Sequence, residues 1–142
     1  MNLFLDTSSL FKLYHREKGT EELDELFKRK EVSSIYLSEI SKIEFESVAW
    51  KKVRIKEIDT THANGLISIF RKDYKKYIFI EDDSHVKELA KELLQKYGLS
   101  GLKTLDALQL ATAVSLKEKI RLAKSSDISL LTFFEQENIK TK

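Results

Sequence analysis

The sequence predicts an α/β fold, a three-layer α/β/α sandwich with a short, mostly parallel central sheet. Short apolar runs of strand length alternate along the chain with longer stretches in which apolar residues recur every three to four positions, as in helices. This alternation is typical of β–α–β units, whose helices cover both faces of a parallel sheet. The 142 residues are enough for one domain with a single core, so we expect one domain over residues 1–142.

The first predicted strand is the apolar run Leu3–Leu5, which stops at the carboxylate of Asp6. Its three residues are all apolar, so we expect it to be buried on both faces of the sheet. The hydroxyl residues Thr7, Ser8 and Ser9 are typical of a helix start, and a short amphipathic helix is predicted from there to a break at Gly19.

A second helix is predicted from Thr20, because acidic residues open it and a basic turn, Lys28 to Lys30, closes it, which matches the helix dipole. The run Ser34–Leu37 is predicted as the second strand. The stretch from Ser38 to Arg54 that follows has helical periodicity and is predicted as the third helix.

A fourth helix is predicted to begin at Asp59 or Thr60 and to extend to Tyr74, followed by a third strand at Tyr77–Ile80. A fifth, amphipathic helix follows a cap at Asp83 or Ser84. It is predicted to end at Gly98, a residue suited to the left-handed conformation that terminates many helices.

Thr104 is predicted to cap a sixth helix through Ser115, which is apolar over most of its circumference and should therefore be buried. The run Ile120–Ala123 is predicted as the fourth strand. A last helix covers Ile128 to Phe134, and Ile139 is a candidate start for a terminal strand.

Composition excludes several classes of site. The chain has no cysteine, which removes disulfides, thiolate zinc sites and cysteine nucleophiles and fits a reducing cytoplasm. The histidines His15, His62 and His85 lack the spacing of a zinc-binding pair, so we expect any metal ligands to be oxygens. We find no membrane-spanning run and no export signal, and we expect the protein to stay in the cytoplasm. A net charge of +2 requires that any nucleic-acid binding arise from local arrangement.

Four acids stand directly after a predicted strand or in the first turn of the helix beyond it, namely Asp6, Glu44, Asp106 and Asp127. The carboxyl ends of parallel strands gather at one edge of a sheet, which is where open α/β sheets place their ligand sites. The sequence therefore predicts that the four carboxylates converge there.

Each acid also has a structural alternative. On position alone, Asp6 is more simply explained as a helix N-cap than as a metal ligand. Glu44 shares the predicted buried stripe of its helix with Ile40 and Val48, yet Ser41 and Glu44 also have the spacing of a capping box.

Asp106 would suit the positive end of its helix, although its neighbours Leu105, Ala107 and Leu108 are all apolar. For Asp127, an N-cap is as good an explanation as a ligand role.

Convergence of these acids would be costly without a counter-charge. Two carboxylates about 4 Å apart repel by roughly 4 kcal/mol at an effective dielectric constant near 20. Several such pairs would rival the stability of a typical domain, about 5 to 15 kcal/mol. Unless some acids are protonated or paired with Lys or Arg, the cluster needs a cation. An all-oxygen ligand set suits Mg²⁺ or Mn²⁺, which support phosphodiester hydrolysis.

Four motifs together resemble those of PIN domains, and specifically the VapC-type toxins of toxin–antitoxin pairs. They are Leu5-Asp6-Thr7-Ser8, Ile43-Glu44-Phe45-Glu46-Ser47, Leu105-Asp106-Ala107-Leu108-Gln109-Leu110-Ala111 and Ser125-Ser126-Asp127. The resemblance covers nearly the whole chain. Two positions depart from it: Lys103 stands where relatives often carry Arg, and Leu122-Ala-Lys-Ser-Ser-Asp127 replaces a more usual apolar-apolar-Thr-x-Asp.

The resemblance implies a PIN-like fold and a Mg²⁺- or Mn²⁺-dependent endoribonuclease. In that family the acids matching Asp6, Glu44, Asp106 and Asp127 hold the metal, with Ser8 and Ser125 as supporting contacts. It also implies a homodimer inhibited by an antitoxin protein.

Lys12, Lys42 and Lys103 are candidates for holding the RNA backbone because they lie near the acids in sequence, although most helical lysines are only solvated. One alternative function is a PIN-like protein that binds RNA or a partner without catalysis. The other is a receiver-type phosphoacceptor switch, which is disfavoured because Asp6 has no acidic neighbour.

Overall fold

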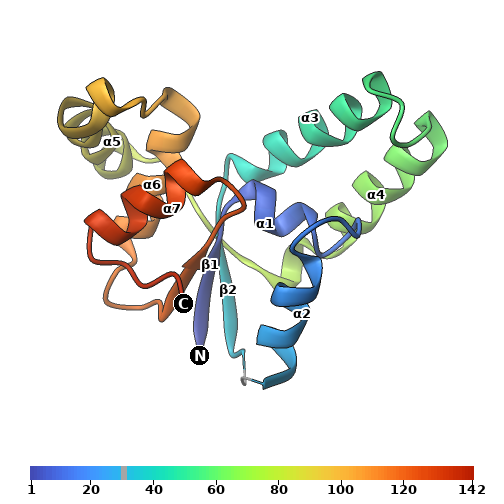
Figure 1. The fold of residues 1–142 in the computed structure, drawn as a ribbon, viewed down its shortest axis with the longest axis horizontal. Helices are drawn as coiled ribbons and strands as arrows, with labels where there is room; N and C mark the ends of the chain where they lie inside the picture. Colours follow the sequence, from blue (N-terminus) through green and yellow to red (C-terminus); the bar gives the residue numbers. More distant parts are fainter. Residues whose placement is uncertain (30–31) are drawn as a thin grey trace.

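The computed structural model describes residues 1–29 and 32–142. Within them, four strands form one sheet in the order β3-β2-β1-β4 (Figure 1). All three strand pairings are parallel, which confirms the predicted sheet. The strands are β1 (Asn2–Leu5), β2 (Ser34–Ser38), β3 (Ile78–Ile80) and β4 (Leu122–Lys124).

The sheet separates two buried apolar clusters. Phe4 of β1 belongs to the cluster beneath α5, α6 and α7, whereas Leu3 and Leu5 belong to the cluster beneath α1 to α4, because successive side chains of a strand point to opposite faces. All three are fully buried, so the predicted three-layer sandwich is confirmed. The helices are α1 (Thr7–Phe11), α2 (Thr20–Arg29), α3 (Ser41–Arg54), α4 (Thr60–Lys72), α5 (Ser84–Tyr97), α6 (Thr104–Ser115) and α7 (Ile128–Gln136), with 3₁₀ turns η1 (Tyr74–Lys76) and η2 (Gly98–Ser100).

Two helix starts follow the predicted capping. The carboxylates of Asp59 and Asp83 accept hydrogen bonds from backbone N–H groups three residues later, at the starts of α4 and α5. The predicted end of α2 at Lys30 lies outside the described residues.

Two predicted details of helix ends are wrong. α5 ends before Gly98 as predicted, but Gly98 has an ordinary φ of −57° because the chain continues into η2, and the left-handed residue is Gly101, with φ of +101°. Thr104 is the first residue of α6 and not its cap; Lys103 holds the cap position without a side-chain hydrogen bond.

The third helix also differs from the prediction. It begins at Ser41 and not at Ser38, because Ser38 is the last residue of β2 and pairs with Ile80 of β3. Its buried stripe runs through Ser41, Phe45 and Ala49, while Ile43 is 73% exposed.

The C-terminal strand predicted at Ile139 is not formed. The backbone N–H of Ala123 in β4 donates to the carbonyl of Lys140, and Ile139 itself is buried in the core. The segment thus runs beside the sheet edge, although it is not itself a strand.

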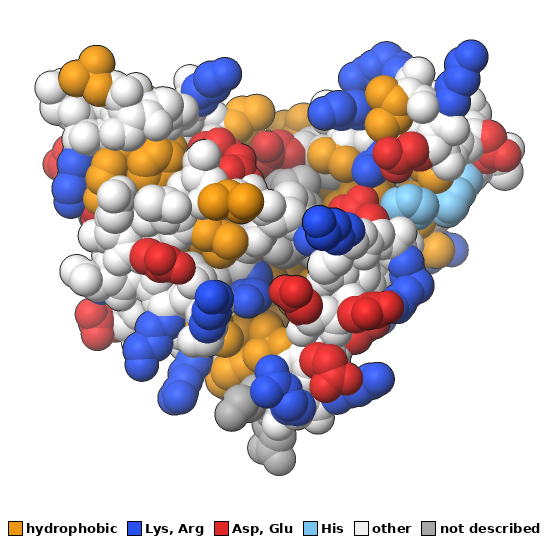
Figure 2. Space-filling model, in the orientation of Figure 1, with side chains coloured by type: hydrophobic (Ala, Val, Ile, Leu, Met, Phe, Trp, Pro, Cys, Tyr) orange, Lys and Arg blue, Asp and Glu red, His pale blue; other side chains and the backbone are white. Residues whose placement is uncertain are grey.

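The arrangement leaves a notch at the carboxyl end of β1 and β2 (Figure 1). Helices α5, α6 and α7 stand on one side of it, and α3 and α4 extend away from the sheet on the other. We call residues 41–72 the α3–α4 arm. Figure 2 shows the notch as a hollow in the molecular surface with acidic side chains at its base. Within the described residues no helix combines the length and apolar character that a membrane span requires.

Candidate functional site

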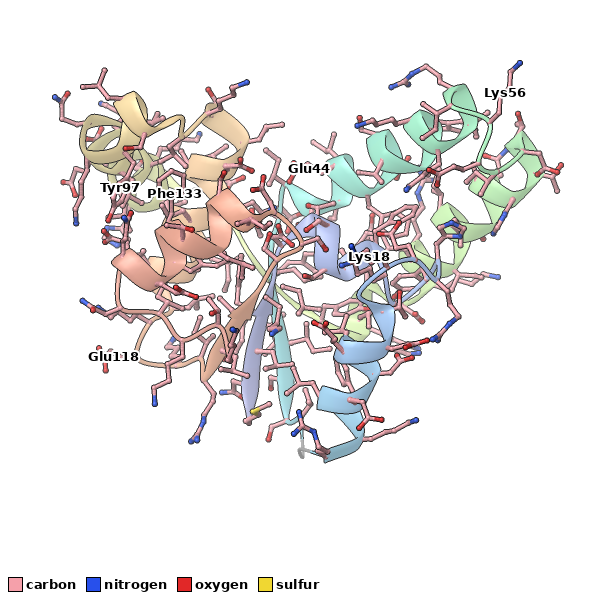
Figure 3. The ribbon with its side chains drawn as sticks, viewed as in Figure 1. Lys18, Glu44, Lys56, Tyr97, Glu118 and Phe133 are labelled. Atoms are coloured by element: carbon pink, nitrogen blue, oxygen red, sulfur yellow. The ribbon has the colours of Figure 1, made fainter. Side chains whose placement is uncertain are left out.

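The structure brings the four predicted acids to one place. A cavity of about 360 Å³ at the carboxyl edge of the sheet is lined by Asp6, Glu44, Asp106 and Asp127. Each acid comes from a different segment: the end of β1, the first turn of α3, the first turn of α6 and the start of α7. Figure 3 labels Glu44 at the base of the notch. Convergence therefore follows from the parallel topology.

Asp6 fills the N-cap role considered for it from the sequence, and it also lines the acidic cavity. It is the N-cap of α1, where its Oδ1 accepts from the backbone N–H of Ser9 at 2.9 Å. Its carboxylate also accepts from the Ser8 hydroxyl at 2.8 and 2.9 Å and from the Ser125 hydroxyl at 2.5 Å. The structure thus brings both predicted supporting serines onto Asp6.

Burial makes the Asp6 carboxyl a weaker acid than an exposed aspartate. Only 5% of the residue is exposed, and this desolvation raises the pKa of its carboxyl from 3.8 to about 6. The hydrogen bonds from Ser125, Ser9 and Ser8 oppose the rise, and the negative charge of Asp106 adds to it. The pKa of Asp6 therefore lies within reach of neutral pH.

Glu44 is held by two donors from other elements. Its Oε1 accepts from the Thr7 hydroxyl and from Gln109 Nε2, both at 2.8 Å. The capping box considered for Ser41 and Glu44 is not formed, because Ser41 lies inside the helix and its hydroxyl bonds to Thr7 and Gln109 instead. Glu44 is thus oriented by tertiary contacts.

Gln109 is a site residue that the sequence reasoning did not single out. It is 2% exposed, and its Nε2 donates to Thr7, Ser41 and Glu44. Its Oε1 is buried with no hydrogen-bond partner within the described part of the chain. A usable signal was present, since Gln109 follows Asp106 by three residues and so lies on a similar face of α6.

The other two acids interact through their charges. Burial raises the pKa of Asp106, and the negative charges of Asp127 and Glu44 raise it further, while Lys103 opposes them. Asp127 is the N-cap of α7 and accepts from the N–H of Ser129 at 2.8 Å. Asp127 therefore combines a capping role with a place in the cavity.

The predicted basic residues are placed differently from one another. The charge of Lys103 reaches Asp106, and Lys12 lines a neighbouring cavity of about 280 Å³ that also contains Ser125. Lys42 lies outside the site cavity. Its ammonium sits over the rings of Tyr74 and Phe79 and pairs with Glu39 at 2.7 Å.

Lys51 and Lys52 of α3 line the cavity instead, and the sequence reasoning did not select them. The sequence feature that could have identified Lys51 and Lys52 is the basic run Lys51-Lys-Val-Arg-Ile-Lys56. Such runs often mark nucleic-acid contacts.

The donor chemistry fits a hard divalent cation. Among residues 1–29 and 32–142, none of the four acids forms an ion pair, so no Lys, Arg or His in direct contact balances their charge there. Carboxylate and hydroxyl oxygens are the ligands preferred by Mg²⁺ and Mn²⁺. In the same residues, however, no three Asp, Glu or His side chains are arranged to hold a metal as they stand. Both oxygens of Asp6 are engaged by serine hydroxyls, so metal binding requires local side-chain movement.

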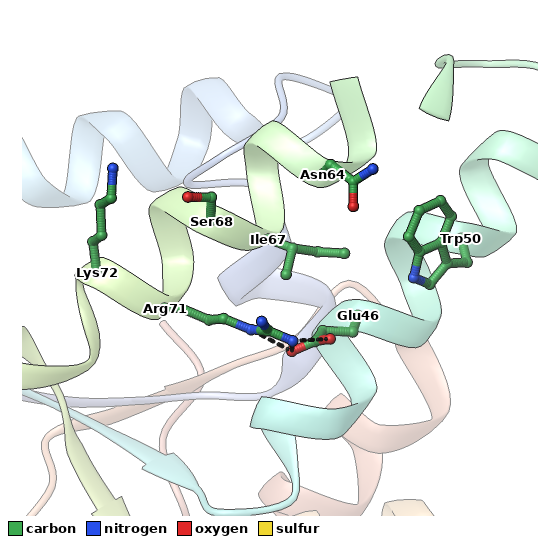
Figure 4. Close-up of a pocket in the computed structure, with 7 residues that line it drawn as sticks. All are labelled: Glu46, Trp50, Asn64, Ile67, Ser68, Arg71 and Lys72. Atoms are coloured by element: carbon green, nitrogen blue, oxygen red, sulfur yellow. Dashed lines mark hydrogen bonds and ion pairs between the residues drawn. The ribbon is translucent and has the colours of Figure 1, made fainter. Parts of the chain in front are cut away.

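A second cavity, of about 480 Å³, lies between α3 and α4 and contains none of the four acids (Figure 4). Trp50 and Ile67 contribute to its wall. Its one guanidinium, Arg71, is bound to the carboxylate of Glu46 by hydrogen bonds of 2.6 to 3.0 Å. This cavity is therefore chemically distinct from the acidic one.

Comparison with known proteins identifies relatives of this fold. A family model described as PIN domain matches residues 3–133. No curated protein sequence gave a match.

Among solved structures, the chain is similar to VapC20 of Mycobacterium tuberculosis, described as a sarcin-ricin loop cleaving toxin, at 18% identity and a TM-score of 0.67, covering 92% of this chain and 93% of that one. It is also similar to FitAcB from Neisseria gonorrhoeae (14% identity, TM-score 0.68, 98% and 95% covered). A third similar structure is VapBC2 from Rickettsia felis bound to a promoter DNA fragment, at 16% identity and a TM-score of 0.65. The match covers 100% of this chain and 98% of that one. At these identities the structural likeness concerns the fold.

Proposed function

This chain belongs to the PIN-domain family, and on that premise we propose that it is a metal-dependent endoribonuclease that hydrolyses RNA phosphodiester bonds. The observation that carries the proposal is the convergence of Asp6, Glu44, Asp106 and Asp127 on one cavity without an ion pair among the described residues. The negative charges of Asp127 and Glu44 already disfavour the charged form of Asp106, and a divalent cation in the cavity would relieve this repulsion.

The residues of the site would take different roles around a bound metal ion. Asp6 and Asp106 face the cavity from rigid elements and would hold Mg²⁺ or Mn²⁺, with Glu44 and Asp127 completing the acidic set. When bound, such a cation activates water and stabilises negative charge on the phosphoryl oxygens. Ser8 and Ser125 position the Asp6 carboxylate through their hydroxyl groups. Lys12 and Lys103 remain candidates for contacts with the RNA backbone.

We further propose that the protein is the toxin of a toxin–antitoxin pair and acts in the cytoplasm. The support is the fold, which it shares with VapC20 and with chains of solved VapBC assemblies. The proposed partners are RNA as substrate, a cognate antitoxin protein and a second copy of the chain in a homodimer.

Cleavage of RNA by the purified protein tests the enzymatic proposal. We expect cleavage in Mn²⁺ or Mg²⁺, loss of cleavage in EDTA, and loss in Asp106→Asn. The matched control is Asp83→Asn, the same chemical change at an exposed N-cap of α5 outside the cavity, which should keep full activity. Cleavage that persists in both EDTA and Asp106→Asn would indicate a contaminating nuclease and contradict the proposal.

A PIN-like protein that binds RNA or a partner without catalysis is the second candidate. The observation favouring it is that no three Asp, Glu or His side chains of the described residues stand ready to hold a metal. A calorimetric titration with Mn²⁺ separates the two functions. Binding that is lost in Asp106→Asn supports the nuclease, and absence of binding supports the non-catalytic reading. The receiver-type switch loses its basis, since the family match is to PIN domains.

A further inference from the structure

The outer part of the α3–α4 arm carries a short basic segment. Four of the six residues from Lys51 to Lys56 are Lys or Arg and none is acidic, in a chain whose net charge is only +2. Positive charge that is scattered over a surface has little consequence, whereas a local run can attract polyanions. The segment spans the end of α3 and the turn towards α4, where Figure 3 labels Lys56 at the far end of the arm.

This basic segment begins at the acidic cavity. Glu44, Val48, Lys51 and Lys52 of α3 line the same cavity, together with Ile55 just beyond the helix. At about 100° per residue, Lys51 lies only about 20° from Glu44 around the helix axis, so both side chains project from one face. The wall of the cavity therefore changes from acidic to basic along a single helix.

Three of the four basic residues of this segment can offer their positive charge to a ligand. Lys52 is paired with Glu17 at 3.1 Å and with Glu57 at 3.0 Å, which ties the arm to the loop after α1. By contrast, no ion pair is found for Lys51, Arg54 or Lys56 within residues 1–29 and 32–142, and all three are exposed. Lys52 thus has a structural role, and the other three can meet a ligand.

The spacing of these charges matches a nucleic-acid backbone. A rise of 1.5 Å per residue places Lys51 about 10 Å and Arg54 about 15 Å from Glu44 along the helix. One strand of a stacked nucleic acid advances about 3.4 Å per nucleotide. These distances correspond to about three to four nucleotides beyond the acids.

We propose that Lys51, Arg54 and Lys56 bind the phosphates of the substrate RNA on one side of the scissile bond, so that the α3–α4 arm forms a track leading out of the acidic cavity. The inference rests on the proposed nuclease function and extends it by naming the surface that holds the flanking nucleotides. Phosphate contacts of this kind position the strand without reading its sequence. Lys52 holds the arm in place, and Lys51 is the contact nearest the reacting phosphate.

Salt-dependent RNA binding tests the track. The probe is a fluorescein-labelled single-stranded RNA of about 12 nucleotides, long enough for the three to four nucleotides of the track and those in the cavity, measured by anisotropy in EDTA at several KCl concentrations. The variant is Lys51→Ala, Arg54→Ala, Lys56→Ala. Its matched control is Lys87→Ala, Lys117→Ala, Lys119→Ala, which removes the same charge from exposed positions that do not line the site cavity.

Three lost phosphate contacts should lower the slope of log Kd against log salt by about 2, at about 0.7 per contact on a single strand. Between about 50 and about 200 mM KCl, wild-type affinity should then fall by a factor about 20 times larger than that of the track variant. The control triple variant should keep the wild-type slope. In Mn²⁺, the track variant should raise KM and keep kcat within about twofold, because it removes binding that is equal in ground and transition states.

Equal slopes in the track variant and the control would overturn the inference, even if the wild type cleaves RNA. Unchanged RNA binding with lost inhibition by an antitoxin would also overturn it, because the surface would then belong to a protein partner. A wild-type protein that binds RNA through the track but cleaves none contradicts the nuclease proposal alone, so the two failures are distinguishable.

Discussion

Replacing Asp6 with Asn should stabilise the metal-free protein while abolishing activity. Asn has the shape of Asp and is an equally good N-cap, so its Oδ1 can still accept from the backbone N–H of Ser9. Its amide can donate to the hydroxyl oxygens of Ser8 and Ser125, which now donate to the carboxylate. The substitution therefore removes the buried charge and keeps the local structure.

The size and sign of the effect follow from the pKa of Asp6. Burial raises this pKa from 3.8 to about 6, so the folded state holds the proton more tightly than the unfolded chain does. The associated stability is fully present below pH 3.8 and is lost as the pH rises through about 6. At 1.36 kcal/mol per pH unit the full loss is about 3 kcal/mol. The Asn variant does not titrate, so it should exceed the wild type by up to that amount at about pH 8.

Urea denaturation in EDTA, followed through the fluorescence of the single tryptophan, Trp50, measures the difference. We expect the free energy of unfolding of Asp6→Asn to exceed that of wild type at about pH 8 and to approach it at about pH 4. The control Asp83→Asn, at an exposed N-cap, should stay within about 0.5 kcal/mol of wild type at both pH values. An Asp6→Asn protein that is no more stable than wild type at about pH 8, or a difference in stability that does not depend on pH, would show that the buried charge of Asp6 does not destabilise the fold.

Three further predictions concern packing and pairing. Gln109→Leu removes the donor that holds Glu44 and should cost about 1 to 3 kcal/mol of unfolding free energy, measured by urea denaturation; an unchanged midpoint would show that the amide is dispensable. Phe45→Ala empties a fully buried position of α3, whose ring packs against Phe11 and Phe70, and should cost about 3 to 5 kcal/mol, so a loss below about 1 kcal/mol in thermal or urea unfolding would contradict this packing. Arg71→Ala breaks an exposed pair with Glu46 and should leave the urea midpoint close to that of wild type; a clearly lowered midpoint would mean that the pair is more shielded than the structure shows.

The sheet was predictable because local signals and topology agree. The strands at Leu3–Leu5 and Ser34–Leu37 lie inside β1 and β2, and the caps at Asp59 and Asp83 are formed as predicted. Parallel pairing of these strands then places acids at one sheet edge without further information. The predicted order of strands and helices along the chain was therefore sufficient to locate the site.

What the sequence could not supply depends on tertiary contacts. Helical spacing predicts a buried stripe of α3 through Ile40, Glu44 and Val48, but the helix starts at Ser41 and its buried residues are Ser41, Phe45 and Ala49. Helical spacing alone therefore does not give the environment of Glu44. What orients it are hydrogen bonds from Thr7 and from Gln109, a residue 65 positions away that only the fold brings within reach of Glu44.

The roles of the lysines also do not follow from how near they lie to the four acids in the sequence. Lys42 lies only two residues from Glu44, yet its ammonium packs on aromatic rings away from the cavity, whereas Lys51 lines it. Which side of a helix faces a cavity depends on the helix boundary and on the neighbouring elements, and residue spacing gives neither.

Anomalous scattering from crystals grown with Mn²⁺ would locate the divalent cation that we propose the four converging acids hold. We expect one strong peak in the acidic cavity, at about 2.0 to 2.2 Å from carboxylate oxygens of Asp6 and Asp106. The Ser8 or Ser125 hydroxyl should have moved off the Asp6 oxygen that the metal takes. A peak elsewhere on the molecule, or no peak at saturating Mn²⁺, would contradict the claim.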